Sequence, residues 1–240
     1  MSRVGRQRWT DTAETRRSGA RGPGGVERRR ALVAAAVAAI EEHGSDASIG
    51  QIADRAGLVR THVYRHIAGK EELDRAVARH AHAELTTRIR ATFDIDGTPI
   101  DVIRAPIAEH VAWAGEHPNL YRFLVERNYR SGNEEPRIGG SAFASEIFTA
   151  ATRYIPRFGS DRAAAERLII ALLGLIDASV RWWLTHREST REELVDQLTA
   201  EAWLLIDHRL RALGIELDAE ARLRDLLIAG EDYRGDAAAT

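Results

Sequence analysis

Apolar residues recur every three or four positions along most of this chain, which is the spacing of amphipathic helices rather than of strands. Between Leu32 and Ile40 the apolar side chains share one helical face and predict a first helix. Gly- and Pro-containing breaks separate longer segments with the same spacing. The pattern predicts an all-α protein with further helices at 70–93, 99–117, 120–130, 141–157, 161–186, 190–213 and 218–229.

Two short helical patterns lie on either side of Gly57. Ser48 is suited to cap the first of them, and Gly57 can supply the positive φ of a tight turn. The second pattern runs from about residue 60 to 67, with Val63 and Ile67 on its buried side and no acid on its polar side. A polar face rich in donors and cations is typical of the recognition helix of a helix-turn-helix. The alternative is a plain helical hairpin whose polar face is only solvated.

The string AGLVRTHVYRHIAGKEEL, which begins at Ala56, resembles the signature of the TetR/AcrR family of bacterial transcriptional regulators. The sequence departs from the family pattern at Val59, where a Ser or Thr cap is usual, and at Ile67, where Phe is usual. The resemblance implies that phosphates are held by Tyr64, His66 and Lys70, and that the major groove is faced by Arg60, Thr61, His62 and Arg65.

The charges are distributed unevenly along a chain whose net charge is only −2. Residues 1–75 hold fourteen Arg and Lys against ten Asp and Glu, so the basic end is the end with the motif, as nucleic-acid binding requires. Lys70 is the only lysine. There is no cysteine, which excludes disulfides and thiol chemistry and fits a reducing cytosol. We therefore expect a cytoplasmic protein.

We expect a disordered Arg-rich arm at 1–25, a helix-turn-helix domain at 26–73, a larger helical ligand-binding and dimerisation domain at 74–230 and a tail at 231–240. The arm is either a terminus without a role or a basic segment that follows the DNA backbone or minor groove. The stretch RRRALVAAAVAA has some features of a targeting signal. An ordinary helix is favoured because the stretch is mostly Ala and continues into EEHG without a turn.

No polar residue occurs between Leu168 and Ile176, so this helix is apolar on all sides and must be covered on all sides. It is too short for a bilayer, which needs ~20 apolar residues. Together with the next helix it predicts a four-helix bundle between two subunits, like the dimer interface of the family it resembles. The alternative is a monomer core. The expected interface residues are Leu172, Ile176, Trp183, Leu198 and Leu205.

Several polar or aromatic residues lie on apolar helix faces of the larger domain. The family resemblance implies an effector pocket among these helices, lined by apolar groups with a few polar ones. The candidate lining is His110, Trp113, Phe123, Arg127, Phe143, Ile147, Asp177 and Arg181. The alternatives are an internal Asp177–Arg181 ion pair and an ordinary aromatic core.

These features predict a regulator, in the family's usual manner a repressor, that binds a palindromic double-stranded DNA operator as a homodimer. A small apolar or acyl effector would release it, with Arg127 or Arg181 facing an anionic head. The alternative is a helix-turn-helix protein without an effector, either architectural or controlled by a protein partner. The sequence has no HExxH, GxSxG or P-loop motif and no paired histidine spacing, so we expect no enzymatic activity, metal or cofactor.

Overall fold

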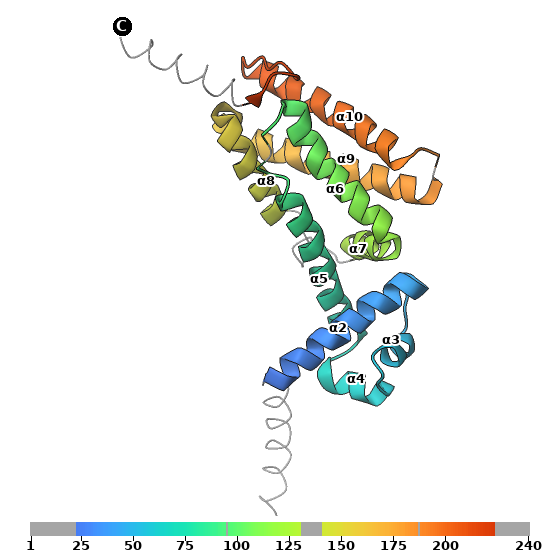
Figure 1. Cartoon of the computed structure of the whole chain (residues 1–240). Coiled ribbons are helices and arrows are strands. Elements are labelled where there is room, and N and C mark those ends of the chain that lie inside the picture. The colour runs from blue at the N-terminus through green and yellow to red at the C-terminus, as the bar shows by residue number, and fades with distance from the viewer. Residues whose placement is uncertain (1–22, 95, 131–140, 187, 224–240) are drawn as a thin grey trace, which may run out of the picture. The chain divides into compact units, whose positions relative to one another are not determined.

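The computed structural model describes residues 23–94, 96–130, 141–186 and 188–223, and within these ranges every regular element is a helix (Figure 1). The predicted all-α fold class is confirmed. The chain divides into two compact units, residues 1–81 and 82–240, and the division falls inside α5 (Lys70–Arg90). Almost all of the expected arm, the second half of the last expected helix and the tail lie outside the described residues.

The first unit packs α2 (Pro23–His43), α3 (Ile49–Arg55), α4 (Arg60–His66) and the beginning of α5 around one small core. Figure 1 shows α3 and α4 beside α2. The core is aliphatic because each helix contributes residues of the predicted spacing, and its members include Leu32, Ala36, Ile40, Ile52, Ala53, Val63, Ile67, Leu73 and Val77. This core fixes the position and orientation of α4 within the first unit.

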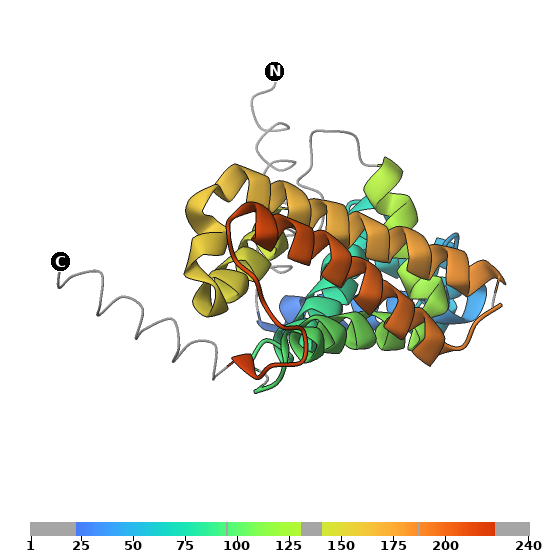
Figure 2. The ribbon, with the colours of Figure 1, turned by 90° about the horizontal axis from the view of Figure 1, so that it is seen from above.

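The second unit contains the end of α5, α6 (Pro99–Glu116), α7 (Pro118–Arg130), α8 (Ser141–Tyr154), α9 (Arg162–His186) and α10 (Arg191–Ala212). The α9 and α10 helices lie side by side, as Figures 1 and 2 show, and α10 also packs along α6. At one end Phe158, Ile169 and Leu210 form a further apolar cluster. None of the described helices is long and apolar enough to cross a membrane.

Local chemistry explains most of the helix ends. Thr98 and Thr190 begin α6 and α10 as capping boxes with Asp101 and Glu193. The expected start of α7 at residue 120 is two residues late. The helix begins at Pro118, a residue favoured at the first helical position. The α8 helix ends earlier than expected, because the 3-10 turn η1 (Pro156–Ser160) follows it.

Candidate DNA-binding and effector sites

The α4 helix is held in place by a cap, a turn and two buried anchors. The Ser48 hydroxyl accepts the Gln51 N–H at 3.3 Å, and the Gln51 side chain accepts the Ser48 N–H at 2.7 Å, so α3 begins where the sequence predicted. Gly57 has φ of +65°, the left-handed conformation expected of the turn. Val63 and Ile67 are 0% and 4% exposed. The opposite side of α4 therefore faces solvent.

Four of the expected DNA contacts lie on this solvent-facing side: Thr61, His62, Tyr64 and Arg65. Tyr64 is 56% exposed, although tyrosine carries a large apolar ring. His66 is partly buried, and the capping residue Val59 makes no side-chain hydrogen bond. This face combines hydroxyl, imidazole and guanidinium donors without an acid, so it can bind both base edges and phosphates.

Arg60 and Lys70 are placed differently from the other expected contacts. The Lys70 Nζ lies 3.0 Å from the Asp74 Oδ1, one helical turn away, so its charge is partly engaged. Arg60 is exposed at the start of α4, and its guanidinium packs against Gly50 in α3. The side chain of Arg60 therefore extends toward α3.

Glu72 links the turn before α5 to α2, a role that the sequence did not reveal. Its carboxylate accepts the Ala68 N–H and the Arg29 guanidinium, each at 2.5 Å. The Ala68 N–H bond, followed by the bond from Arg29, holds the pKa of the Glu72 carboxyl below its ordinary value of 4.5. Arg29 and Glu72 are far apart in sequence, so helical periodicity could not have paired them.

In the second unit, His110 and Asp177 come together at Tyr121. The Tyr121 hydroxyl donates to the Asp177 Oδ1 at 3.1 Å and lies 3.2 Å from the His110 Nε2. Because the hydroxyl proton is directed at Asp177, the phenolic oxygen can accept a hydrogen bond from a protonated Nε2. Burial, and then the Asp177 charge, raise the pKa of Tyr121 well above its ordinary value. Tyr121 therefore stays a donor, and it was not among the expected site residues.

The other expected lining residues are dispersed. Trp113 is fully buried and donates to the Glu84 Oε1 at 3.3 Å, while Phe123 is buried in α7. Phe143 stacks on Phe93 with ring centroids 6.4 Å apart, and Ile147 is partly buried in the cluster around Phe158. Arg181 is exposed, and the side chain of Arg127 lies outside the described part of the chain. These residues do not converge on one described cavity.

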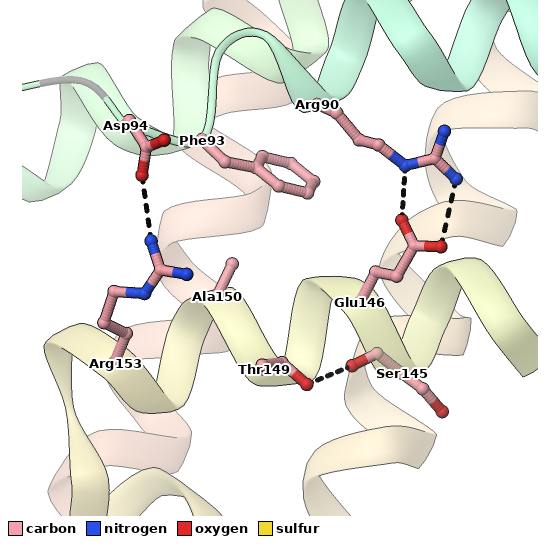
Figure 3. A pocket seen from close by; sticks show the side chains of 8 residues that line it. All are labelled: Arg90, Phe93, Asp94, Ser145, Glu146, Thr149, Ala150 and Arg153. Atoms are coloured by element: carbon pink, nitrogen blue, oxygen red, sulfur yellow. Dashed lines mark hydrogen bonds and ion pairs between the residues drawn. The ribbon is translucent and has the colours of Figure 1, made fainter.

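An open hollow of about 410 Å³ lies between the end of α5 and α8 (Figure 3). Arg90 binds Glu146 through two nitrogens at 2.5 and 3.0 Å, and Arg153 donates to the Asp94 carboxylate at 2.9 Å. Phe93 and Ala150 lie between these ion pairs, and the remaining lining residues are Ser145 and Thr149. The hollow thus has an apolar middle and charged ends, as an amphipathic molecule would need.

The comparison that decides the family concerns the first unit. Residues 32–77, which include α3, α4 and the turn between them, match the model of the bacterial regulatory proteins of the tetR family. The chain belongs to the TetR family. As a TetR-family protein it is a DNA-binding transcriptional regulator.

Relatives of this TetR-family chain extend the likeness beyond the motif. An uncharacterised HTH-type transcriptional regulator of Mycobacterium tuberculosis is 26% identical over 179 residues, covering 74% of this chain and 76% of the relative. The HTH-type transcriptional activator FasR of Mycolicibacterium smegmatis is 26% identical over 196 residues, covering 80% of this chain and 88% of the relative. Both relatives are named as transcriptional regulators.

Solved structures show the same fold. A tetR-family transcriptional regulator from Streptomyces coelicolor superposes with a TM-score of 0.59 at 21% identity, covering 78% of this chain and 85% of that one. The fatty acid degradation regulator FadR from Bacillus halodurans superposes with a TM-score of 0.57 at 17% identity, covering 77% and 96%. Both combine an N-terminal helix-turn-helix domain with a helical domain, as this TetR-family chain does.

The expected dimer contacts of this TetR-family protein fall into two groups. Ile176, Trp183 and Leu198 are buried within their own unit, so they cannot form the outer surface of an interface, whereas Leu172 is partly buried and Leu205 is 43% exposed. The large exposed apolar side chains of α9 and α10 are Ile170, Trp182, Leu204 and Leu205. The apolar run in α9 is thus incompletely covered by its own unit.

Among the described residues, no group of three His, Asp or Glu could hold a metal.

Proposed function

We propose that this TetR-family regulator binds a palindromic operator as a homodimer and represses transcription until a small effector releases it. The observation that carries the proposal is the exposed, acid-free face of α4, with Tyr64 and Arg65 outside and Val63 anchored in the core. A helix presented in this way fits the major groove, where base edges can be read. A DNA target also implies a cytoplasmic protein.

Footprinting on the DNA upstream of its own and neighbouring genes tests this role. We expect a protected segment with two-fold symmetry and half-sites ~34 Å apart along the duplex axis, one helical turn. Tyr64→Ala should weaken binding to all sequences alike, whereas Thr61→Ala or His62→Ala should change which bases are preferred. Absence of protection at low salt would contradict the proposal, because non-specific phosphate binding is strongest there.

The dimer proposal rests on the exposed apolar side chains of α9 and α10. Ile170, Trp182 and Leu204 are 51%, 61% and 68% exposed, which is costly for such large side chains unless a partner covers them. Two such pairs of helices would form a four-helix bundle about a two-fold axis. Leu204→Glu should convert the dimer to a monomer in sedimentation. Asp196→Asn, on an exposed position of the same helix, is the control.

The effector proposal rests on the hollow at the end of α5 and on the continuity of that helix. The helix runs from Lys70, beside the helix-turn-helix, to Arg90, which lines the hollow. A ligand that binds one conformation better than another shifts the population toward it. Amphipathic acyl compounds fit the apolar middle and the charged ends. They should raise the melting temperature and release DNA, whereas a DNA-binding protein without an effector would respond to no compound class.

Activation is a second candidate for the regulatory outcome, because the relative FasR is named as a transcriptional activator. A reporter fused to the footprinted promoter distinguishes the two outcomes. Deletion of the regulator should raise expression if it represses and lower expression if it activates. Tyr64→Ala should reproduce the deletion in either case, since both outcomes need operator binding.

A further inference from the structure

The side chain of Arg60 lies against the backbone of Gly50 in the first unit. Gly50 is buried in the first turn of α3, in a backbone conformation that does not require glycine. A Cβ atom added at position 50 would lie 2.2 Å from the Arg60 Nη2 and 2.9 Å from its Cζ and Nε. The guanidinium of Arg60 therefore fills the volume that the side chain of residue 50 would otherwise take.

The guanidinium of Arg60 is available to bind a further partner. Among the described residues no hydrogen bond or ion pair engages it, whereas Arg29, Arg55 and Lys70 have acid partners. Those partners are Glu72, Glu42 and Asp74. Arg60 is also exposed at the start of α4. An exposed guanidinium that packs on a neighbouring backbone has less freedom to lose when it binds an anion.

We propose that Gly50 and Arg60 together form a phosphate clamp at the junction of α3 and α4, so that Arg60 positions the protein on DNA and does not read bases. This inference rests on the proposed binding of α4 in the major groove. In a helix-turn-helix the second helix enters the groove while the first crosses the backbone. A guanidinium folded from α4 onto α3 is therefore directed at the sugar-phosphate strand. Gly50 is the positioning residue, because any larger side chain would displace the cation.

The clash at position 50 involves only the far end of a flexible side chain. Gly50→Ala should therefore move the guanidinium without unfolding the unit. Alanine also favours helix more than glycine does, so the melting temperature should stay the same or rise. DNA binding, in contrast, should fall. This opposite response of folding and binding separates a clamp from a merely structural glycine.

A double-mutant cycle on the full chain tests the proposal. The variants are Arg60→Ala, Gly50→Ala and the two combined. Thr61→Ala, on the same turn of α4, is the contrasting variant: it removes a proposed base contact and no charge, so it should change base preference and leave the salt slope unaltered. The probe is a random-sequence duplex pool of about 30 base pairs, which spans three helical turns. Binding is measured against salt concentration, and bound sequences are recovered to determine base preference.

We expect Arg60→Ala to weaken binding to the whole pool about tenfold, as for the loss of one charge-assisted contact. It should lower the slope of log affinity against log salt by about one without changing base preference. Gly50→Ala should reproduce both effects in part. In the Arg60→Ala background it should have none, because there is no guanidinium left to displace.

Two results would overturn the clamp while leaving DNA binding intact. One is a changed base preference in Arg60→Ala with an unaltered salt slope, which would make Arg60 a base reader. The other is an equal effect of Gly50→Ala with and without Arg60, which would make the glycine independent. If the unaltered protein binds no duplex at low salt, the proposed function fails as well, so the two failures are distinguishable.

Discussion

The two compact units of this TetR-family protein use polar side chains in opposite ways. In the first unit most of the polar residues of α4 face solvent, and Val63 and Ile67 beneath them are aliphatic. In the second unit His110 and Tyr121 are buried and bonded to one another. A binding face can therefore be recognised from one short helix, whereas an internal polar network depends on helices that are distant in sequence.

Removal of a core side chain should show the largest difference between the two units. Trp113 is fully buried, so Trp113→Ala should cost about 3–5 kcal/mol of the free energy of unfolding. Tyr64→Ala, at a 56% exposed position, should change stability by about 0.5 kcal/mol or less. Urea unfolding followed by circular dichroism measures both. A similar loss in the two variants would mean that the Tyr64 side chain packs against the unit and is not exposed.

The buried network should give an intermediate effect. Tyr121→Phe removes the hydroxyl that lies between His110 and Asp177 and leaves a buried imidazole without that partner. The expected cost is about 1 kcal/mol, because the hydrogen bonds of the hydroxyl are lost while the His110 Nε2 still lies 3.4 Å from the Asp177 Oδ1. Thermal unfolding gives the size of the loss, and Phe123→Leu, at another buried aromatic of α7, controls for simple repacking. An unchanged midpoint in Tyr121→Phe would show that the network does not stabilise the fold.

The ion pair that flanks the hollow should matter for ligand response more than for stability. Arg90→Ala breaks the contact with Glu146, which joins α5 to α8 across the hollow. Because both side chains are substantially exposed, the stability loss should be about 1 kcal/mol or less. The increase in melting temperature caused by a bound acyl compound should shrink. Arg104→Ala, which breaks the exposed pair with Asp196 away from the hollow, should leave that increase unchanged.

The smallest expected effect is the loss, at acid pH, of the stabilisation that Glu72 contributes. Since the folded-state pKa of Glu72 lies below its ordinary value of 4.5, its stabilisation is present above pH 4.5 and is lost as the pH falls through the folded-state pKa. Glu72→Gln should be slightly less stable at neutral pH, by about 1 kcal/mol or less. The difference from the unaltered protein should disappear in acid. A constant difference across the pH series of melting curves would contradict the assignment.

Features that depend on residues close together in the sequence could be predicted, whereas contacts between residues far apart in the sequence could not. Ser48 and Gly57 were assigned correctly, because a cap or a turn depends on residues a few positions away. The buried anchors of α4 followed from helical periodicity for the same reason. Arg90 and Glu146 meet across 56 positions, and Tyr121 meets Asp177 across 56, so no local pattern could reveal either contact.

The apolar surface of α9 and α10 illustrates the same limit. Periodicity identified two strongly apolar helices but could not separate the side that packs within the unit from the side left outside. Trp183 and Trp182 are neighbours in sequence, yet one is 6% and the other 61% exposed. The packing of α9 on α6, α7, α8 and α10 decides this difference.

The continuity of α5 has a practical consequence for dissection of the protein. The boundary between the compact units falls after Ala81, inside a helix whose hydrogen bonds run on to Arg90. A fragment cut at that boundary would end in mid-helix, with four terminal carbonyl groups lacking their partners. An isolated fragment that contains the helix-turn-helix should therefore retain the whole of α5. The end of this helix, and not the boundary between the compact units, sets the shortest fragment that folds stably.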